Sequence, residues 1–114
     1  MTLKEKKADS LDNFKIFETN QFLKDLEQDF SDQQAPLDKK NYLTGQERIR
    51  KKLASYAYPQ LKQNPYFGKN IKKLKGYLPE TWRYRIGPCR FFYEIDDQKK
   101  IISMIAADNR QSAY

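Results

Sequence analysis

The sequence has 114 residues, 39% of them hydrophobic and 32% charged, which predicts one small folded domain and excludes two separate cores. Its net charge of +7 favours a polyanionic partner, with nucleic acid, an acidic protein and anionic lipid as the candidates. One cysteine and no histidine exclude an intrachain disulfide, a histidine acid–base pair and a histidine metal site, and they argue against structural zinc.

The start of the chain is polar. Residues 1–13 lack periodicity and the apolar stretch of a secretory signal, so we expect a flexible arm there. A single domain is then expected over residues 14–114. No run in the chain approaches the ~20 apolar residues that span a bilayer, which favours a soluble, cytoplasmic protein without membrane association.

The first half of the domain predicts a strand and then a helix. Residues 14–18 alternate between apolar and polar side chains, which is typical of a short strand. Thr19 or Asn20 can cap the helix that follows. Apolar residues in this helix recur at helical spacing: Phe22, Leu23, Leu26 and Phe30. Residues 31–43 are polar and predict a loop.

A second helix is predicted to begin after Thr44 and to end near residue 62, before a proline that breaks it. Thr44 and Glu47 have the form of a capping box. The apolar stripe of this helix comprises Ile49, Leu53, Tyr56, Ala57 and Leu61. Residues 67–79 form a basic connector to which the pattern assigns no regular structure.

Residues 82–86 predict a strand with two different faces. The apolar face comprises Trp82, Tyr84 and Ile86. Arg83 and Arg85 lie on the opposite face, because residues two apart on a strand point the same way. Gly87 and Pro88 can then make a two-residue turn into the next strand.

The rest of the chain continues as a meander. Residues 89–95 predict a strand, residues 96–98 turn the chain, and the apolar run 100–107 predicts a central strand. This order predicts an α+β domain in which two N-terminal helices pack on one face of a small, mostly antiparallel four-stranded sheet. The first strand is expected at an edge of that sheet.

The strand arginines are the most informative candidates for function. Arg83 and Arg85 are ~6.6 Å apart along the strand, so two guanidinium groups can hold one phosphate or two adjacent ones. Arg90 can approach the same end of the sheet across the hairpin. The alternative is that these residues are solvated positions on the outer face of an antiparallel sheet.

Other segments could add to a nucleic-acid site. Lysines of the connector could guide a phosphate backbone or belong to an ordinary soluble loop: Lys69, Lys72, Lys73 and Lys75. Aromatic residues could stack on bases, although such residues more often anchor a core or a loop: Tyr66, Phe67 and Tyr77. Arg110 and Tyr114 follow the central strand, and the tail could return them over the sheet or simply fray.

Several segments follow one another in a particular order: Asn64-Pro65, residues 73–76, residues 82–87, Cys89-Arg90, residues 93–96, Asn109-Arg110 and Tyr114. Together they resemble the RelE/ParE toxin superfamily, and the resemblance extends over residues 14–114. It implies a fold of two N-terminal helices against a small antiparallel sheet. It also implies an antitoxin that wraps the toxin and masks its basic face and, in the RelE branch, cleavage of messenger RNA in the ribosomal A site.

The resemblance also implies a set of site residues. The basic pair of the family's strand falls on Arg83 and Arg85, and its hairpin arginine falls on Arg90. Its loop basic residue falls on Lys75, and its C-terminal arginine and tyrosine fall on Arg110 and Tyr114. The implied reaction is attack of a ribose 2′-hydroxyl on the adjacent phosphate, with no metal and no cofactor.

The chain departs from the best-studied pattern of this family, in which the strand pair is lysine. Arginine keeps its proton, with a pKa above ~12, so Arg83 and Arg85 are expected to clamp phosphate and not to act as bases. The general base stays open among Glu94, Asp108, Tyr114, a loop lysine and the C-terminal carboxylate. Catalysis could instead rest mainly on holding the 2′-hydroxyl in line with the phosphate.

These observations predict a toxin of a toxin–antitoxin pair: a ribosome-dependent mRNA endoribonuclease that inhibits translation and is neutralised by a cognate antitoxin. The expected partners are the antitoxin, the ribosome and mRNA. Two alternatives stay open. One is a DNA gyrase inhibitor of the ParE branch, which performs no RNA chemistry, and the other is a non-catalytic, basic nucleic-acid-binding module. A C-terminal arginine and tyrosine together with the strand arginines favour the nuclease.

Overall fold

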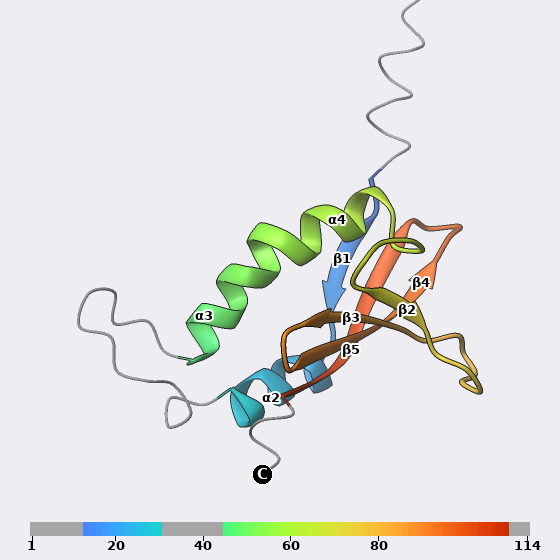
Figure 1. Ribbon diagram of the computed structural model, residues 1–114. Helices are drawn as coiled ribbons and strands as arrows, with labels where there is room; N and C mark the ends of the chain where they lie inside the picture. Colours follow the sequence, from blue (N-terminus) through green and yellow to red (C-terminus); the bar gives the residue numbers. More distant parts are fainter. Residues whose placement is uncertain (1–12, 31–44, 110–114) are drawn as a thin grey trace, which may run out of the picture.

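The computed structural model describes residues 13–30 and 45–109 (Figure 1). The strands of this part of the chain are β1 (Lys15–Glu18), β2 (Ile71–Lys73), β3 (Trp82–Ile86), β4 (Cys89–Asp96) and β5 (Ile101–Asn109). Its helical segments are α2 (Asn20–Asp29), α3 (Gly45–Lys52), the π-helical η2 (Leu53–Ala57) and α4 (Tyr58–Gln63). No helix within the described ranges combines the length and the apolar character that crossing a membrane requires. Outside these ranges lie residues 1–12 of the arm predicted over 1–13, the predicted loop over residues 31–43, and Thr44 of the predicted capping box.

The strands form one mixed sheet in the order β1-β5-β4-β3-β2. Strand β1 lies at an edge, as expected, and runs parallel to β5, whereas the other neighbouring strands are antiparallel. The prediction of four strands was wrong, because the basic connector contributes β2. This three-residue strand is too short to show a period of two, and it exists because it pairs with β3, with Ile71 opposite Tyr84.

Helix α2 begins where the sequence predicted. The hydroxyl oxygen of Thr19 accepts a hydrogen bond from the backbone N–H of Phe22 at 3.2 Å, so Thr19 is the cap. The same hydroxyl donates to the carbonyl oxygen of Met104 in β5 at 2.9 Å. One side chain therefore both starts the helix and ties it to the interior of the sheet.

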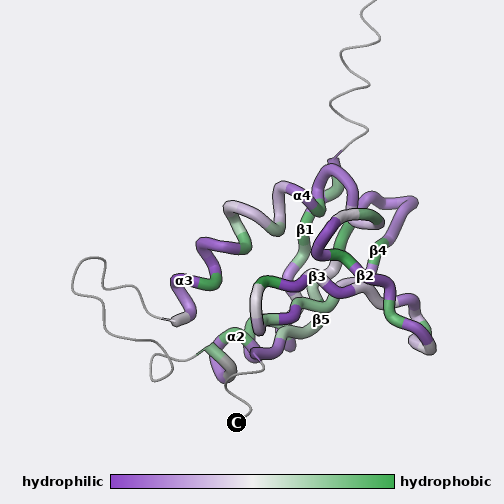
Figure 2. Tube along the Cα trace, in the orientation of Figure 1, coloured by the Kyte–Doolittle hydropathy of each residue, from purple (hydrophilic) through white to green (hydrophobic). Residues whose placement is uncertain are grey.

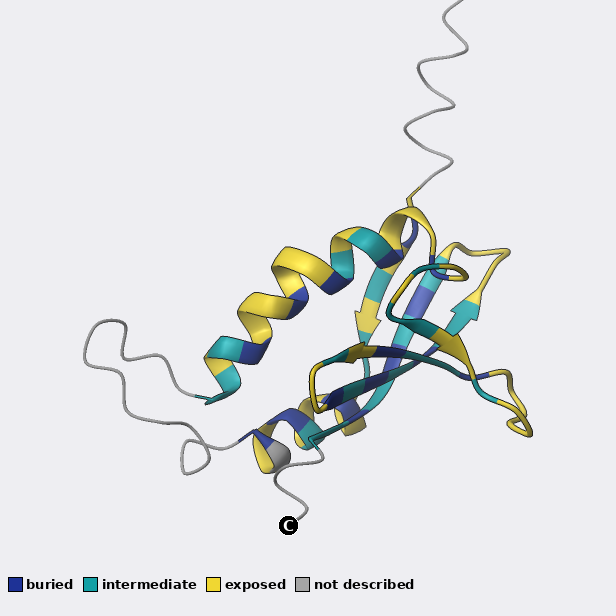
Figure 3. Cartoon of the chain, in the orientation of Figure 1, coloured by how far each residue is buried: buried dark blue, intermediate teal, exposed yellow. Residues whose placement is uncertain are grey.

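Segments α3, η2 and α4 follow one another as one helical rod (Figure 1). Hydrophilic and hydrophobic residues alternate along it (Figure 2), and its buried residues follow one side (Figure 3). These buried residues are spaced four apart: Ile49, Leu53, Ala57 and Leu61. In a regular α-helix, residues spaced four apart are displaced around the helix axis by about 40° at each step. The wider π turn over Leu53–Ala57 counters this displacement and keeps the stripe against the sheet.

The π turn also explains one wrong prediction. Tyr56 was expected on the apolar stripe, three residues after Leu53, but its side chain is 66% exposed. A turn that holds more residues brings the fourth residue, Ala57, back to the buried side. The residue in the sequence that indicates an irregular turn is Pro59, which lies inside the rod. In an α-helix a proline ring clashes with the carbonyl group four residues earlier.

A single core lies between the helical segments and one face of the sheet (Figure 3). Strand β4 contributes alternate residues, with Cys89, Phe91 and Tyr93 buried. The helices contribute Phe22, Leu26 and Phe30 from the first helix and its end, together with the buried stripe of the rod. The opposite face of the sheet carries the residues between these positions, and that face holds the candidate site.

Candidate nucleic-acid interface

A pocket of about 420 Å³ lies at the end of the sheet where β3 turns into β4. Its lining residues are Arg83, Arg85, Pro88 and Arg90, and we call it the arginine pocket. Its volume falls in the ~300–1,000 Å³ range of ligand sites in proteins. The three arginines singled out in the sequence therefore share one concave surface, whereas simple solvated positions would not have to converge.

Strand register explains why these arginines converge. Arg85 lies directly opposite Arg90 in the β3–β4 ladder, and Arg83 lies one residue pair further along the same face. Tyr84 and Phe91 pair on the other face, where both are buried in the core. Burial of the apolar face thus forces the arginines onto the opposite face of the sheet.

The turn between the two strands is part of the pocket. Gly87 has φ +57°, a left-handed conformation that glycine adopts without cost, and the two-residue turn predicted at Gly87-Pro88 is confirmed. The Nε atom of Arg85 donates to the carbonyl oxygen of Gly87 at 2.9 Å. This contact anchors the guanidinium group by its inner edge and leaves its two terminal nitrogens for a ligand.

Arg83 has a different environment. Its Nε atom is buried and has no hydrogen-bond partner among the described residues. A buried donor without an acceptor costs about 1–3 kcal/mol, so the fold holds this guanidinium group in place at an energetic cost. Lys72 lies opposite Arg83 in the β2–β3 ladder and is exposed, so it adds positive charge beside the pocket.

Arg90 is paired with Asp108, which lies opposite it in the β4–β5 ladder. Its Nε donates to Oδ1 of Asp108 at 3.1 Å, and its Nη2 donates to Oδ2 at 2.6 Å. The guanidinium carbon also lies 5.9 Å from the centre of the Phe92 ring, a cation–π distance. The three guanidinium groups of the pocket thus have one carboxylate beside them, and an excess of positive charge remains.

The connector lysines do not gather at one place. Lys73 forms an ion pair with Glu80 at 3.1 Å and lies 5.8 Å from the centre of the Trp82 ring, so it is engaged away from the pocket. Lys73 and Lys75 both line a second hollow of about 610 Å³ around the loop between β2 and β3. Lys69 is exposed in the turn before β2. Of the four lysines, only Lys72 is brought directly beside a pocket arginine by strand pairing.

The remaining predicted site residues are the two in the C-terminal tail and the candidate bases. Arg110 and Tyr114 lie outside the described residues. Among the candidate bases, Asp108 is held by Arg90, and Glu94 lies half-buried on β4, four residues after Arg90 and on the same face. The partnership of Arg90 with Asp108 was not predicted, because the register of β4 against β5 cannot be obtained from either strand alone.

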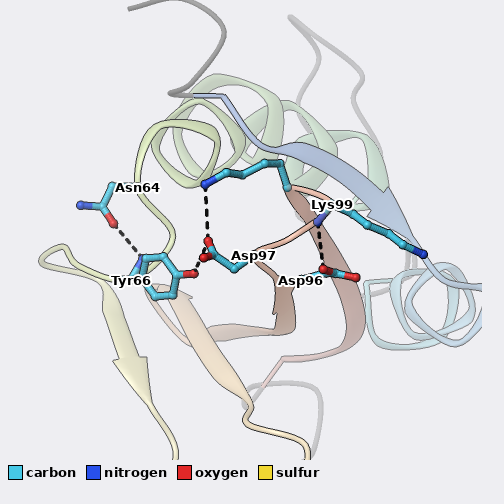
Figure 4. Close-up of polar contacts among 6 residues, drawn as sticks. Asn64, Tyr66, Asp96, Asp97 and Lys99 are labelled. Carbon is cyan, nitrogen blue, oxygen red and sulfur yellow. Dashed lines mark hydrogen bonds and ion pairs between the residues drawn. The ribbon is translucent and has the colours of Figure 1, made fainter. Parts of the chain in front are cut away.

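Tyr66 proves to be an anchor at the opposite end of the sheet. Its ring lies edge-on to Phe14 and Trp82, with centroids 6.3 Å and 5.5 Å away. Its hydroxyl donates to Oδ1 of Asp97 at 2.9 Å (Figure 4). Burial and this hydrogen bond raise the pKa of Tyr66 to about 12, and the same bond lowers the pKa of Asp97. The side chains of Phe67 and Tyr77 stay exposed.

Comparisons with known proteins come from sequence and from structure. A family model described as the ParE toxin of the type II toxin–antitoxin system parDE matches residues 16–114. No curated protein matches the chain in sequence.

The solved structures similar to this fold include two toxin–antitoxin complexes and one free toxin. The RelBE2 complex of Mycobacterium tuberculosis has a TM-score of 0.61 and 22% identity, over 90% of this chain and 97% of that chain. The archaeal RelE–RelB complex of Pyrococcus horikoshii has a TM-score of 0.58 and 18% identity, over 86% and 96%. A free E. coli RelE with two arginines changed to alanine has a TM-score of 0.52 and 17% identity, over 89% and 87%. At these identities the likeness shows a shared fold.

Proposed function

Because this chain belongs to the ParE toxin family, and is thus a RelE/ParE-superfamily toxin of a type II toxin–antitoxin system, we propose that it inhibits translation by cleaving mRNA on the ribosome. The observation that carries the proposal is the arginine pocket. Arg83, Arg85 and Arg90 present their guanidinium groups to one hollow, which suits the extra negative charge of a phosphodiester under attack.

The proposed reaction needs no group beyond the RNA and the protein. The ribose 2′-oxygen attacks the adjacent phosphorus and loses its proton to a base, while the bond from phosphorus to the 5′-oxygen breaks and that oxygen takes a proton. The products are a 2′,3′-cyclic phosphate and a 5′-hydroxyl. The three arginines stabilise the pentavalent state as fixed cations, since arginine does not give up its proton. Neither a metal ion nor a cofactor takes part in this proposal.

Further residues extend the proposed site. Arg110 and Tyr114 are proposed to join it from the C-terminal tail. The connector lysines are proposed to guide the RNA backbone towards it: Lys69, Lys72, Lys73 and Lys75. Lys72 has the strongest support, because it is exposed directly beside Arg83. Electrostatic guidance of this kind is independent of base sequence and weakens with salt.

A cognate antitoxin is the proposed protein partner. Two of the structurally similar proteins were solved as complexes of a toxin with its antitoxin, those of Mycobacterium tuberculosis and Pyrococcus horikoshii. In our proposal the antitoxin neutralises this chain by covering its basic face. Cytoplasmic action follows from the proposed target, since mRNA is translated there.

A translation reaction with a defined mRNA tests the nuclease proposal. The full chain should cut the message at codons in the ribosomal A site, and Arg85→Ala and Arg90→Ala should lower the rate about 10²- to 10³-fold while the protein stays folded. Lys99→Ala is the matched control. It removes one positive charge from the exposed turn between β4 and β5, at the far end of the sheet, and should cut normally. Full activity in both pocket variants would remove the proposed site.

A second candidate is inhibition of DNA gyrase, which the match to the ParE family model favours. This function uses no RNA chemistry, so the same reaction distinguishes it. Blocked supercoiling with intact mRNA would support the gyrase target. Binding of nucleic acid without either effect would leave a non-catalytic binding module.

A further inference from the structure

We propose that Asp108 is a positioning residue, which fixes the guanidinium group of Arg90 so that its terminal nitrogens face the RNA phosphate. The proposal rests on the proposed nuclease function. It is carried by the two-point contact between the side chains, 3.1 Å from Nε to Oδ1 and 2.6 Å from Nη2 to Oδ2.

Three constraints define the orientation of Arg90. The pairing of Arg90 with Asp108 across β4 and β5 places their side chains on the same face. The carboxylate then occupies one whole edge of the planar guanidinium group. The Phe92 ring, 5.9 Å from the guanidinium carbon, limits the group on another side. A flexible arginine would have to lose this freedom on binding RNA, whereas Arg90 has lost it beforehand.

The same arrangement recurs in the other two arginines of the pocket. Arg85 has its Nε bound to the carbonyl oxygen of Gly87 at 2.9 Å. Arg83 has its Nε buried. In all three residues the Nε atom is therefore engaged or inaccessible, and the terminal nitrogens supply the remaining donors. In Arg90 these donors are Nη1 and the second hydrogen of Nη2, whose first hydrogen contacts Asp108. The geometry favours end-on contact with phosphate by all three groups, and Asp108 supplies the constraint for Arg90.

This role differs from that of a general base. Both carboxylate oxygens of Asp108 accept hydrogen bonds from Arg90, so the observed contacts of this side chain are those of a group that orients Arg90. The positioning role also differs from that of a carboxylate that merely competes with the RNA phosphate for Arg90. A competitor would weaken RNA binding, and its removal would lower KM, whereas loss of a positioning contact misaligns Arg90 in the transition state and lowers kcat.

The test compares Asp108→Ala, Asp108→Asn and Asp108→Glu in the mRNA cleavage reaction on ribosomes. We expect Asp108→Ala to lower kcat about 10- to 100-fold with KM within about threefold, because a misplaced group is costly even when binding persists. Asp108→Asn should also lose most of the wild-type kcat, because its neutral amide offers only one acceptor oxygen. Asp108→Glu keeps a carboxylate and should therefore retain a higher kcat than Asp108→Ala.

Asp97→Asn is the matched control. It removes the same charge from the other end of the same two strands, where Asp97 contacts Tyr66 (Figure 4). Asp97 also accepts a hydrogen bond from Lys100 there. Its kcat should equal that of the wild type. The positioning role would be overturned if Asp97→Asn lost as much kcat as Asp108→Ala. It would also be overturned if Asp108→Ala had a kcat equal to or above that of the wild type.

Nitrogen-15 NMR of the arginine Nε–H groups separates this inference from the proposed function. In the wild-type protein the Arg90 Nε–H signal should be sharp and protected from exchange with water, and Asp108→Ala should remove that protection. Asp97→Asn should leave the signal unchanged. If the wild-type chain fails to cleave mRNA, the nuclease proposal fails, while an unprotected Arg90 signal in the wild-type protein would overturn the positioning contact by itself.

Discussion

The individual arginines of the pocket are not equivalent, although they carry the same charge. Arg85 is anchored to a turn carbonyl and Arg90 to a carboxylate, whereas the buried Nε of Arg83 has no partner in the part of the chain that the structure describes. Each contact restricts a planar group with fixed donor directions. A lysine could reproduce the charge at these positions but not the geometry, because its ammonium group sits on a flexible stem.

Arg83→Lys tests whether geometry or charge matters at this residue. The variant keeps the net charge and loses the planar fork, so we expect mRNA cleavage to fall about 10- to 100-fold. Lys72→Arg is the control. It makes the reverse exchange, lysine to arginine, at the position opposite Arg83, and it should leave the rate of cleavage within about threefold of the wild type. Normal cleavage by Arg83→Lys would show that charge alone sets the activity.

At the scale of elements, the β3–β4 turn shapes the site, and the long rod holds an edge of the sheet. The β3–β4 turn brings Pro88 and the Gly87 carbonyl to the pocket, and it depends on the positive φ of Gly87. Strand β1 is held to the rod by Glu18, whose carboxylate accepts two hydrogen bonds from Arg50 at 3.0 Å each and one from Tyr58. This cluster ties the parallel edge of the sheet to the rod on both sides of the π turn.

Gly87→Ala should affect activity as well as stability. A side chain at φ +57° costs about 1–2 kcal/mol, although among the described residues none beyond the two chain neighbours comes within 4 Å of the added carbon. Gly76→Ala is the control, because Gly76 has φ +81°, is equally open and lies in the loop between β2 and β3. Both variants should lower the unfolding free energy by similar amounts in urea denaturation, and only Gly87→Ala should slow cleavage. Equal rates in the two variants would argue that the turn does not shape the pocket.

The Glu18 cluster predicts a loss of stability in acid. Burial opposes the charged carboxylate, but hydrogen bonds from Arg50 and Tyr58 outweigh it and hold the pKa of Glu18 below its ordinary value of 4.5. A carboxyl whose pKa is lowered by folding stabilises the protein above its unfolded pKa, and that contribution is lost as the pH falls through the folded pKa. Urea denaturation between pH 7 and pH 2.5 should therefore show a smaller acid loss in Glu18→Gln than in the wild type. Parallel curves for the two proteins would contradict this assignment.

At the scale of the whole molecule, charge is separated along the chain. Residues 1–34 carry a net charge of −3, whereas residues 35–114 carry +10. The segment from Lys62 to Arg90 alone carries eight basic residues and one acidic residue, and it contributes β2, β3 and the pocket. A field of this kind draws a polyanion to one region of the surface before any specific contact forms.

Salt dependence measures how much of RNA binding this field supplies. The affinity for a short single-stranded RNA should fall as the salt concentration rises. Loss of one contact to phosphate should make the slope of log affinity against log salt concentration shallower by about 0.7. Arg85→Ala should show that change, and Lys99→Ala should show a smaller one despite the same change in net charge. Fluorescence anisotropy at several salt concentrations gives the slopes. Equal slopes for the two variants would mean that net charge, and not the pocket, governs binding.

Much of this architecture was predictable from local patterns. The alternation in residues 82–86, the cap at Thr19 and the turn at Gly87 are confirmed, because each depends on neighbours within a few residues. Two predictions were wrong for a different reason. Strand β2 has almost no apolar pattern of its own, and Tyr56 leaves the stripe because the rod widens into a π turn beneath it.

The chain's own pattern was thus sufficient for the α+β class, the apolar and basic faces of β3, and the candidate arginines, since periodicity and turn chemistry act over short distances along the backbone. The pairing of Arg90 with Asp108, the buried Nε of Arg83 and the parallel docking of β1 required the folded molecule. These features depend on strand register, which is set when residues far apart in sequence pack together and bury one face of the sheet.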